Sequence, residues 1–157
     1  MRVSVQETDF DVGAETEALT AGRSDVGAVA SFVGYVRADK LAGESAAAQA
    51  VSAMTLEHYP GMTEKSLEAI VAEAESRWSL LGVRVIHRFG RLVPGDRIVF
   101  VGVAGSHRGE AFAACEFIMD YLKTRAPFWK KEDTPDGGRW VDAREADDAA
   151  AEKWGKA

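Results

Sequence analysis

The fold of this chain is decided by residues 97–124, which read RIVFVGVAGSHRGEAFAACEFIMDYLKT. The first eight residues are nearly all apolar, which is typical of a buried strand in the centre of a sheet. After Gly105 and Ser106 the apolar residues recur at helical spacing, so we expect a helix over 107–124 with Ser106 as its N-cap. The stripe that faces the core should comprise Phe112, Cys115, Ile118 or Met119, and Leu122.

Shorter strands and helices surround this central unit. We predict strands at 3–5, 27–37, 54–59 and 83–88, and helices at 14–19, from a Thr63 cap to Trp78, and in the charged, Ala-rich segment that ends at Trp154. This order predicts an α+β fold, with an antiparallel or mixed sheet and helices on one face. We expect one domain over 1–157, with a mobile loop at about 38–52 and a charged tail at about 142–157.

The composition is that of an ordinary globular protein. The chain has 157 residues, of which 46% are hydrophobic and 28% are charged. A chain of this length can bury a hydrophobic core without support from disulfides or metal ions. Its net charge of -6 argues against a nucleic-acid-binding protein. It has no apolar run that would span a membrane and no signal-peptide pattern, so we expect a cytoplasmic protein. One cysteine and three scattered histidines predict neither a disulfide nor a metal site.

Residues that could carry chemistry gather at the end of the long helix. Residues 121–132 read YLKTRAPFWKKE and place four cations around Pro127, Phe128 and Trp129, namely Lys123, Arg125, Lys130 and Lys131. A helix C-terminus accounts for Lys123 and Arg125, because cations favour the last turn and proline stops a helix. It does not account for the second lysine pair. A lysine that aromatic surface desolvates has a lowered pKa and can move protons, so we expect a functional site here.

A second basic group is expected where the long helix begins. The free N–H groups of a helix N-terminus and a forked guanidinium suit a phosphate, which makes His107 and Arg108 candidates for anion binding. The same dipeptide at 87–88, inside a predicted strand, is interpreted as structural. Arg37 ends another predicted strand, where a solvated edge charge is the simplest interpretation.

The two basic groups are far apart along one helix. A helix over 107–124 is about 26 Å long, so His107 and Lys123 of one chain would not reach the same small ligand. Either the loop after Pro127 folds back, or two chains share a site across a dimer interface. We favour the shared site.

Five segments of the chain resemble the large, catalytic subunit of molybdopterin synthase, the MoaE family. They are residues 27–37, 56–62, 85–90, 106–108 and 121–132, which read GAVASFVGYVR, LEHYPGM, VIHRFG, SHR and YLKTRAPFWKKE. They follow the family's order, and the last segment, with Trp140 and Val141 behind it, is the most specific. The resemblance implies an α/β hammerhead-like fold with an additional antiparallel β subdomain.

The resemblance also implies a sulfurtransferase of molybdenum-cofactor biosynthesis. The substrate would be cyclic pyranopterin monophosphate, and the product would be molybdopterin with its dithiolene. Sulfur would arrive as a thiocarboxylate on the C-terminal Gly-Gly tail of a small ubiquitin-like partner subunit. Two large subunits would form the central homodimer of a heterotetramer, and no cofactor or metal would be needed.

Residue roles follow from the same resemblance. Lys123 and Lys130 correspond to the two catalytic lysines of the family. The positions that would bind the pterin and its phosphate are Tyr35 and Val36 through their backbone, Arg37, His107, Arg108, Lys130, Lys131, Glu132 and Arg144. A desolvated lysine would move protons, and Cys115, which we expect to be buried, would not carry the sulfur.

Three other functions fit the same residues. A module that binds a ubiquitin-like tail without turnover is disfavoured, because both lysines are present. An acyl or phosphoryl transferase with the same basic pocket would need a nucleophile, a metal or a Gly-rich phosphate loop, and no such motif is found. A structural dimer with solvated basic patches would lose only about a few tenths of a kcal/mol on Lys123→Ala.

Overall fold

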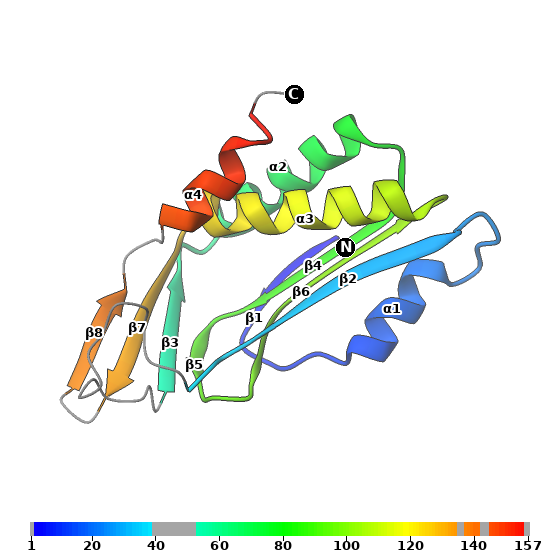
Figure 1. Ribbon diagram of the computed structural model, residues 1–157. Helices are drawn as coiled ribbons and strands as arrows, with labels where there is room; N and C mark the ends of the chain where they lie inside the picture. The colour runs from blue at the N-terminus through cyan, green and yellow to red at the C-terminus, as the bar shows by residue number, and fades with distance from the viewer. Residues whose placement is uncertain (1, 39–52, 135–136, 142–144, 156–157) are drawn as a thin grey trace.

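The computed structural model describes residues 2–38, 53–134, 137–141 and 145–155, which form two β-sheets and four helices (Figure 1). The elements are β1 (Val3–Gln6), α1 (Val12–Thr20), β2 (Ala28–Tyr35), β3 (Ala53–His58), α2 (Met62–Arg77), β4 (Leu80–Arg88), β5 (Gly90–Leu92), β6 (Arg97–Gly105), α3 (Arg108–Arg125), β7 (Phe128–Thr134), β8 (Gly137–Val141) and α4 (Glu145–Glu152). Apart from Ala38, the predicted loop at about 38–52 lies outside the described residues.

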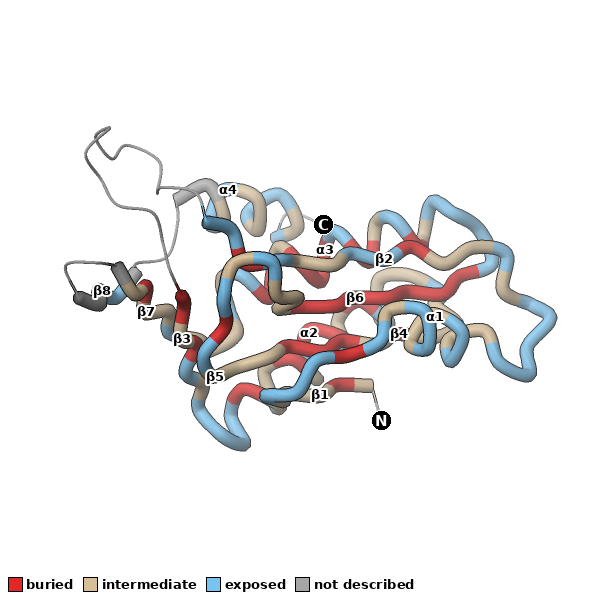
Figure 2. The backbone as a smooth tube through the Cα atoms, turned by 90° about the horizontal axis from the view of Figure 1, so that it is seen from below, coloured by how far each residue is buried: buried red, intermediate tan, exposed pale blue. Residues whose placement is uncertain are grey.

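The larger sheet has the strand order β1-β4-β6-β2. β1 pairs with β4 in parallel, and the other pairings are antiparallel, so the sheet is mixed, as predicted. β6 is an inner strand of this sheet, and Figure 2 shows it buried along most of its length. Its apolar run therefore has the central position that the sequence predicted.

Helices cover both faces of this sheet. α2 and α3 lie together on one face, and α1 lies on the other (Figure 1). The prediction of helices on one face only is therefore wrong. The second face carries its own apolar cluster of Phe10, Ile86 and Phe100, and a Cβ at Gly102 would lie 2.7 Å from the Leu19 side chain of α1. The absence of a side chain at Gly102 thus lets α1 approach the sheet.

α3 is the long helix that the sequence predicted, with two differences. Its N-cap is His107 and not Ser106, and Phe112 is 64% exposed instead of facing the core. The buried residues are Ala111, Ala114, Cys115, Phe117, Ile118, Met119, Tyr121 and Leu122. The stripe is wider than predicted because α3 packs against the sheet, α2 and α4 at once.

The smaller sheet has the order β5-β3-β7-β8, and all its pairings are antiparallel. It is the additional antiparallel unit expected from the resemblance. Sequence periodicity predicted β3 but not β5, β7 or β8. The predicted Thr63 cap is also wrong, since Gly61 is the N-cap of α2, with a φ of 85° and its N–H bonded to Glu64 Oε1 at 3.1 Å. Among the described residues, no helix is both long and apolar enough to cross a membrane.

Candidate active site

The two predicted catalytic lysines lie on different elements that meet at the junction of the sheets. Lys123 is in the last turn of α3, and Lys130 is in β7, which follows almost directly (Figure 1). β7 pairs with β3, placing Lys130 opposite Leu56. The segment after Pro127, which we had treated as a loop, is therefore a strand fixed by a neighbour distant in sequence.

Strand alternation separates Lys130 from Lys131. Side chains of successive strand residues point to opposite faces, so Lys130 shares a face with Phe128 and Glu132. Lys131 lies on the other face, where its ammonium is 6.0 Å from the Trp140 ring. Glu132 is only 4% exposed. The structure thus groups Glu132 with Lys130 and does not group Lys131 with them.

The imidazole of His87 marks where the two lysines converge. It is 5% exposed and stacks on Phe128, with ring centroids 3.8 Å apart and an interplanar angle of 22°. The pKa of His87 is lowered to about 3, mainly by burial and also by the positive charges of Lys123 and Lys130, against the opposing hydrogen bond at the Arg88 carbonyl. The positive charges of both ammonium groups thus act on the same buried ring.

The lysines themselves are not deeply buried in the single chain. Lys123 is exposed and Lys130 is half-buried. We expected aromatic surface to desolvate these lysines. For Lys123 that expectation is wrong at the level of one chain, because the last turn of α3 presents it to solvent. Any desolvation of Lys123 must come from a molecule that docks there.

The end of β2 lies beside the smaller sheet. Val36 is buried with Met54, Leu56 and Leu92 of that sheet, and its N–H and carbonyl both bond to the turn before β6, at Asp96 O and Gly95 N, 2.9 Å each. Tyr35 and Arg37, on either side of Val36, are exposed. The backbone of Val36 that we expected to contact substrate is thus already engaged within the chain.

His107 and Arg108 lie at the other end of the molecule. Both are exposed, at the start of α3. Lys123 lies fifteen positions after Arg108 in the same helix, which corresponds to about 22 Å along the axis. Within one chain the structure does not bring the two basic groups together. Arg144, also predicted to bind substrate, lies outside the described residues.

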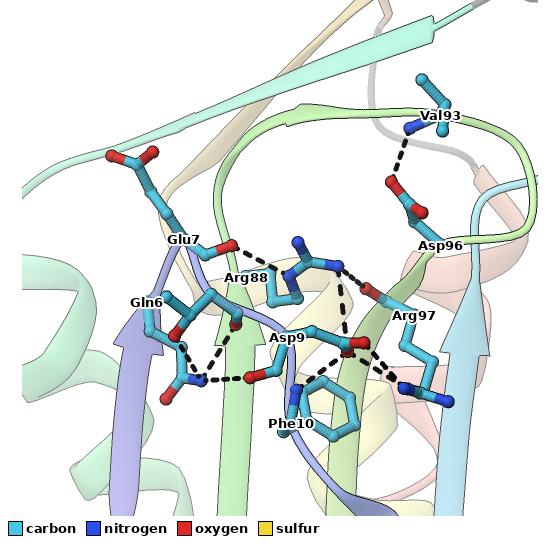
Figure 3. A network of polar contacts seen from close by, with 9 residues as sticks. Gln6, Glu7, Asp9, Phe10, Arg88, Val93, Asp96 and Arg97 are labelled. Carbon is cyan, nitrogen blue, oxygen red and sulfur yellow. Dashed lines mark hydrogen bonds and ion pairs between the residues drawn. The ribbon is translucent and has the colours of Figure 1, made fainter.

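Arg88 has a structural role next to this site (Figure 3). Its side chain donates to Glu7 O at 3.0 Å and to Arg97 O at 2.8 Å. Arg97 in turn binds both oxygens of Asp9, at 3.1 and 2.7 Å, which lowers the pKa of the Asp9 carboxyl. These contacts tie the segment before α1 to the ends of β4 and β6. The interpretation of Arg88 as structural is therefore confirmed.

A surface hollow of about 480 Å³ lies beside this network and not at the lysines. It is lined by Asp9, Phe10, Asp11, Val12, Gly13 and Arg97, none of which we predicted as a site residue. Asp9 and Arg97 in this hollow are already paired with one another, and Asp11 accepts a hydrogen bond from Ala14 N as the N-cap of α1. Within the part of the chain that the structure describes, no three His, Cys, Asp or Glu side chains gather as a metal site would require.

Sequence reasoning missed the residues beneath the lysines. Thr63 was assigned to a helix cap, and His87 was set aside together with Arg88. Only the VIHRFG segment, which contributed to the resemblance, pointed to His87. Contacts with Pro127 and Phe128, which are distant in sequence, bring these side chains under the link from α3 to β7, and no local pattern carries that information.

The fold and the basic residues define an α+β protein with lysines where its two sheets meet and a basic helix start at the far end of α3. The sequence pattern of the MoaE protein family matches residues 5–125. The chain therefore belongs to the MoaE family, as the five segments indicated.

Individual relatives agree with this membership. The molybdopterin synthase catalytic subunit of Ralstonia nicotianae is 61% identical over 153 residues, which cover 98% of this chain and 84% of that protein. The solved molybdopterin biosynthesis MoaE protein from Burkholderia ambifaria is 57% identical, with a TM-score of 0.81 and coverage of 98% of this chain and 97% of that chain. A chain from the complex of subunits 1 and 2 of molybdopterin-converting factor from Helicobacter pylori has a TM-score of 0.69, with coverage of 91% and 90%, and at 20% identity it supports the fold alone.

Proposed function

We propose that this chain is the sulfur-transferring subunit of a molybdopterin synthase. The observation that carries the proposal is the short link that joins Lys123, at the end of α3, to Lys130 in β7, next to the buried stack of His87 on Phe128. Close relatives named as catalytic subunits support the same function. The substrate would be cyclic pyranopterin monophosphate, which takes up two sulfur atoms to form the dithiolene of molybdopterin.

The lysines supply what this chemistry needs. The thiocarboxylate sulfur attacks the pterin side chain to form a thioester, and the phosphate oxygen departs from its cyclic ester. Water then attacks the thioester carbonyl, negative charge develops on its oxygen, and the C–S bond breaks, which leaves the sulfur on the pterin and a carboxylate on the partner. An ammonium at Lys123 stabilises that developing charge, and Lys130 is placed to deliver or remove a proton. Arg37, at the end of β2, and Glu132, next to Lys130 on the same face, complete the proposed pocket.

The sulfur donor would be a small ubiquitin-like subunit with a C-terminal Gly-Gly thiocarboxylate. The name catalytic subunit, borne by the relatives, implies an enzyme of more than one chain. The exposure of Lys123 also fits such a partner, because a tail that docks over the last turn of α3 would cover it. Removing water strengthens the interaction between the ammonium and the developing negative charge.

A homodimer would supply the remaining positive charge. His107 and Arg108 lie too far from Lys123 to act in the same chain, but a second copy could present them to its neighbour's lysines. Exposed guanidinium and helix N–H groups suit the substrate phosphate. This arrangement accounts for two basic groups at opposite ends of one helix.

The test is a reconstituted assay with the thiocarboxylated partner and cyclic pyranopterin monophosphate. Lys123→Ala should remain folded and lose product formation by a factor of about a hundred or more. Arg125→Ala is the matched control, because Arg125 is an exposed cation in the same helical turn that packs over Tyr121, 3.7 Å from the ring centroid.

Two results would count against this function. A stable complex with the partner but no product from the unmodified protein would favour the binding module without turnover. Equal losses in Lys123→Ala and Arg125→Ala would show that the α3 terminus matters only for folding.

A further inference from the structure

The distance between the two lysines depends on the six residues that link them, 124–129. α3 ends at Arg125 and β7 begins at Phe128, so the chain passes from helix to strand through Ala126 and Pro127 alone. A helix end and a strand that meet in so short a link can adopt many relative orientations. Something outside the link must therefore select the one orientation that brings both ammonium groups over the same place.

Thr63 holds the first half of this link. It is fully buried in the first turn of α2, and its hydroxyl donates to Pro127 O at 3.2 Å. The same hydroxyl accepts from the N–H of Tyr59 at 3.0 Å, so both its donor and acceptor capacities are used. Thr63 is thus a side-chain anchor between α2 and the link.

His87 holds the second half. Its ring stacks on Phe128, the first residue of β7, while its Nδ1 lies 2.8 Å from Arg88 O. A carbonyl oxygen only accepts, so the hydrogen bond requires a proton on Nδ1 and fixes the orientation of the ring. The ring cannot turn without losing this bond, and Phe128 cannot leave it without losing the stack. β4 thus fixes the start of β7 through one buried imidazole.

Because two lysines lie close to the link, a neutral imidazole at His87 suits the anchoring role better than a charged one. The charges of Lys123 and Lys130 both act on His87. A second imidazole, that of His58, lies near Phe89 and Phe128, with ring centroids 4.4 and 6.4 Å apart. A charged anchor would repel the two ammonium groups that it has to bring together. Burial keeps the ring neutral, so it supports the lysines sterically and adds no positive charge.

We propose that Thr63 and His87 are positioning residues for the reaction, which clamp the Pro127–Phe128 link so that Lys123 and Lys130 reach the same substrate. Neither residue touches the reacting atoms. The inference rests on the proposed function for its kinetic test, and the geometry of the clamp has a test of its own.

The kinetic test uses pairs of variants that differ only in the anchoring contact. Thr63→Val removes the hydroxyl at nearly constant shape, and Thr63→Ser keeps it. His87→Leu removes the stack on Phe128, and His87→Phe keeps an aromatic ring. Phe100→Leu is the control for destabilisation alone, because Phe100 is buried on the opposite face of the larger sheet, in the cluster with Phe10.

Thr63→Val and His87→Leu should lower kcat by about tenfold or more while KM for the pterin and Kd for the partner change by less than about twofold. Thr63→Ser and His87→Phe should recover most of the lost kcat. Phe100→Leu should keep its kcat per folded molecule even if its melting temperature falls as much as those of Thr63→Val and His87→Leu. A purely structural role would not make kcat recover selectively in the conservative member of each pair.

Hydrogen exchange tests the clamp without turnover. The amides of β7 from Phe128 onward should exchange at least about tenfold faster in Thr63→Val than in Thr63→Ser, with α1 unchanged in both. Unchanged exchange would overturn the clamp whatever the kinetics show. If the clamp is seen by exchange but the unmodified protein makes no product, it is the proposed function that fails. An active protein in which Thr63→Val keeps its full kcat would refute the positioning role.

Discussion

Burial of His87 has a consequence for stability as well as for the site. Burial lowers the pKa of this imidazole to about 3 from the ordinary 6.5, so the folded protein keeps it neutral where the unfolded chain takes up a proton. The unfolded state then binds more protons between these two values. The contribution of His87 to the unfolding free energy is therefore fully present above the unfolded pKa. It falls as the pH drops from 6.5 towards 3, by up to about 1.4 kcal/mol per pH unit.

His87→Phe should remove this acid sensitivity. Between pH 6.5 and pH 5 the unmodified protein should lose about 1.6 kcal/mol of unfolding free energy through this group, and the variant should be spared that loss. Urea unfolding of both proteins at the two pH values measures the difference. Carboxylates titrate mainly below this window, and the other two histidines are common to both proteins. Identical losses in the two proteins would mean that His87 is not held neutral by the fold.

The thiol of Cys115 is expected to be unreactive in the folded protein. It is buried in α3, its thiol lies 3.8 Å from Val101 O, and burial together with the charge of Glu116 raises its pKa to about 11. The thiolate, which is the nucleophile, is therefore almost absent at neutral pH. Iodoacetamide should label the native protein far more slowly than the urea-unfolded chain, and Cys115→Ala should keep sulfur transfer at a stability cost of about 1 kcal/mol. Loss of turnover in folded Cys115→Ala would restore the cysteine as a sulfur carrier.

Individual residues also mark the limit of sequence reasoning about the site. Lys123 and Lys130 were predicted as site residues because they stand in one continuous, specific segment. The separation of Lys131 from Lys130 required knowing that the segment is a strand. Thr63 and His87 became visible only through contacts with Pro127 and Phe128, which tertiary pairing creates.

At the scale of elements, strands with an apolar pattern were predictable and polar ones were not. β6 and β4 carry apolar runs and were placed to within a few residues. β7 reads FWKKEDT, with charged side chains on both of its faces, so it lacks the alternation that identifies a half-buried strand. Its strand conformation comes from pairing with β3 and β8. The boundary of α3 shifted by one residue because the N-cap is set by backbone geometry at His107.

The charged C-terminal helix was predicted, but its role in packing was not. Trp154, just beyond α4, donates from its indole to Asp120 Oδ2 of α3 at 2.7 Å, and its ring lies edge-on to Trp78 and Phe117. Arg77 of α2 donates to the Trp154 carbonyl at 2.7 Å. The end of the chain is thus bound to both helices on this face of the larger sheet.

Trp154→Phe should measure how much the indole hydrogen bond contributes to the unfolding free energy. The ring contacts are largely kept, but the half-buried Asp120 loses a donor, so the unfolding free energy should fall by about 1–2 kcal/mol. Trp140→Phe is the control, because Trp140 is 56% exposed on the outer face of the smaller sheet and should change stability by less than about 0.5 kcal/mol. Equal effects in chemical denaturation would show that the bond to Asp120 contributes nothing.

At the scale of the whole molecule, the fold follows from one chain, whereas the proposed site needs two. The larger sheet, its central strand and the long helix all follow from patterns within the sequence, and the described residues form them without a partner. The same helix then places Lys123 and Arg108 about 22 Å apart. No conformational detail of a single chain can remove that separation, because a continuous α3 imposes it. The homodimer is therefore a requirement of the proposed chemistry and is open to direct test.

Complementation between inactive variants provides that test. If each site combines Lys123 of one chain with Arg108 of the other, a heterodimer of Lys123→Ala and Arg108→Ala has one site with both changes and one intact site. Random exchange of subunits makes about half of the dimers heterodimers, so activity should rise from near zero to about a quarter of the unmodified value. Unfolding and refolding the two variants together, then assaying with the sulfur-bearing partner, measures this recovery. Variants refolded separately and mixed afterwards control for contamination. If both residues act within one chain, co-refolding will yield no more product than either variant alone, and the shared site must be abandoned.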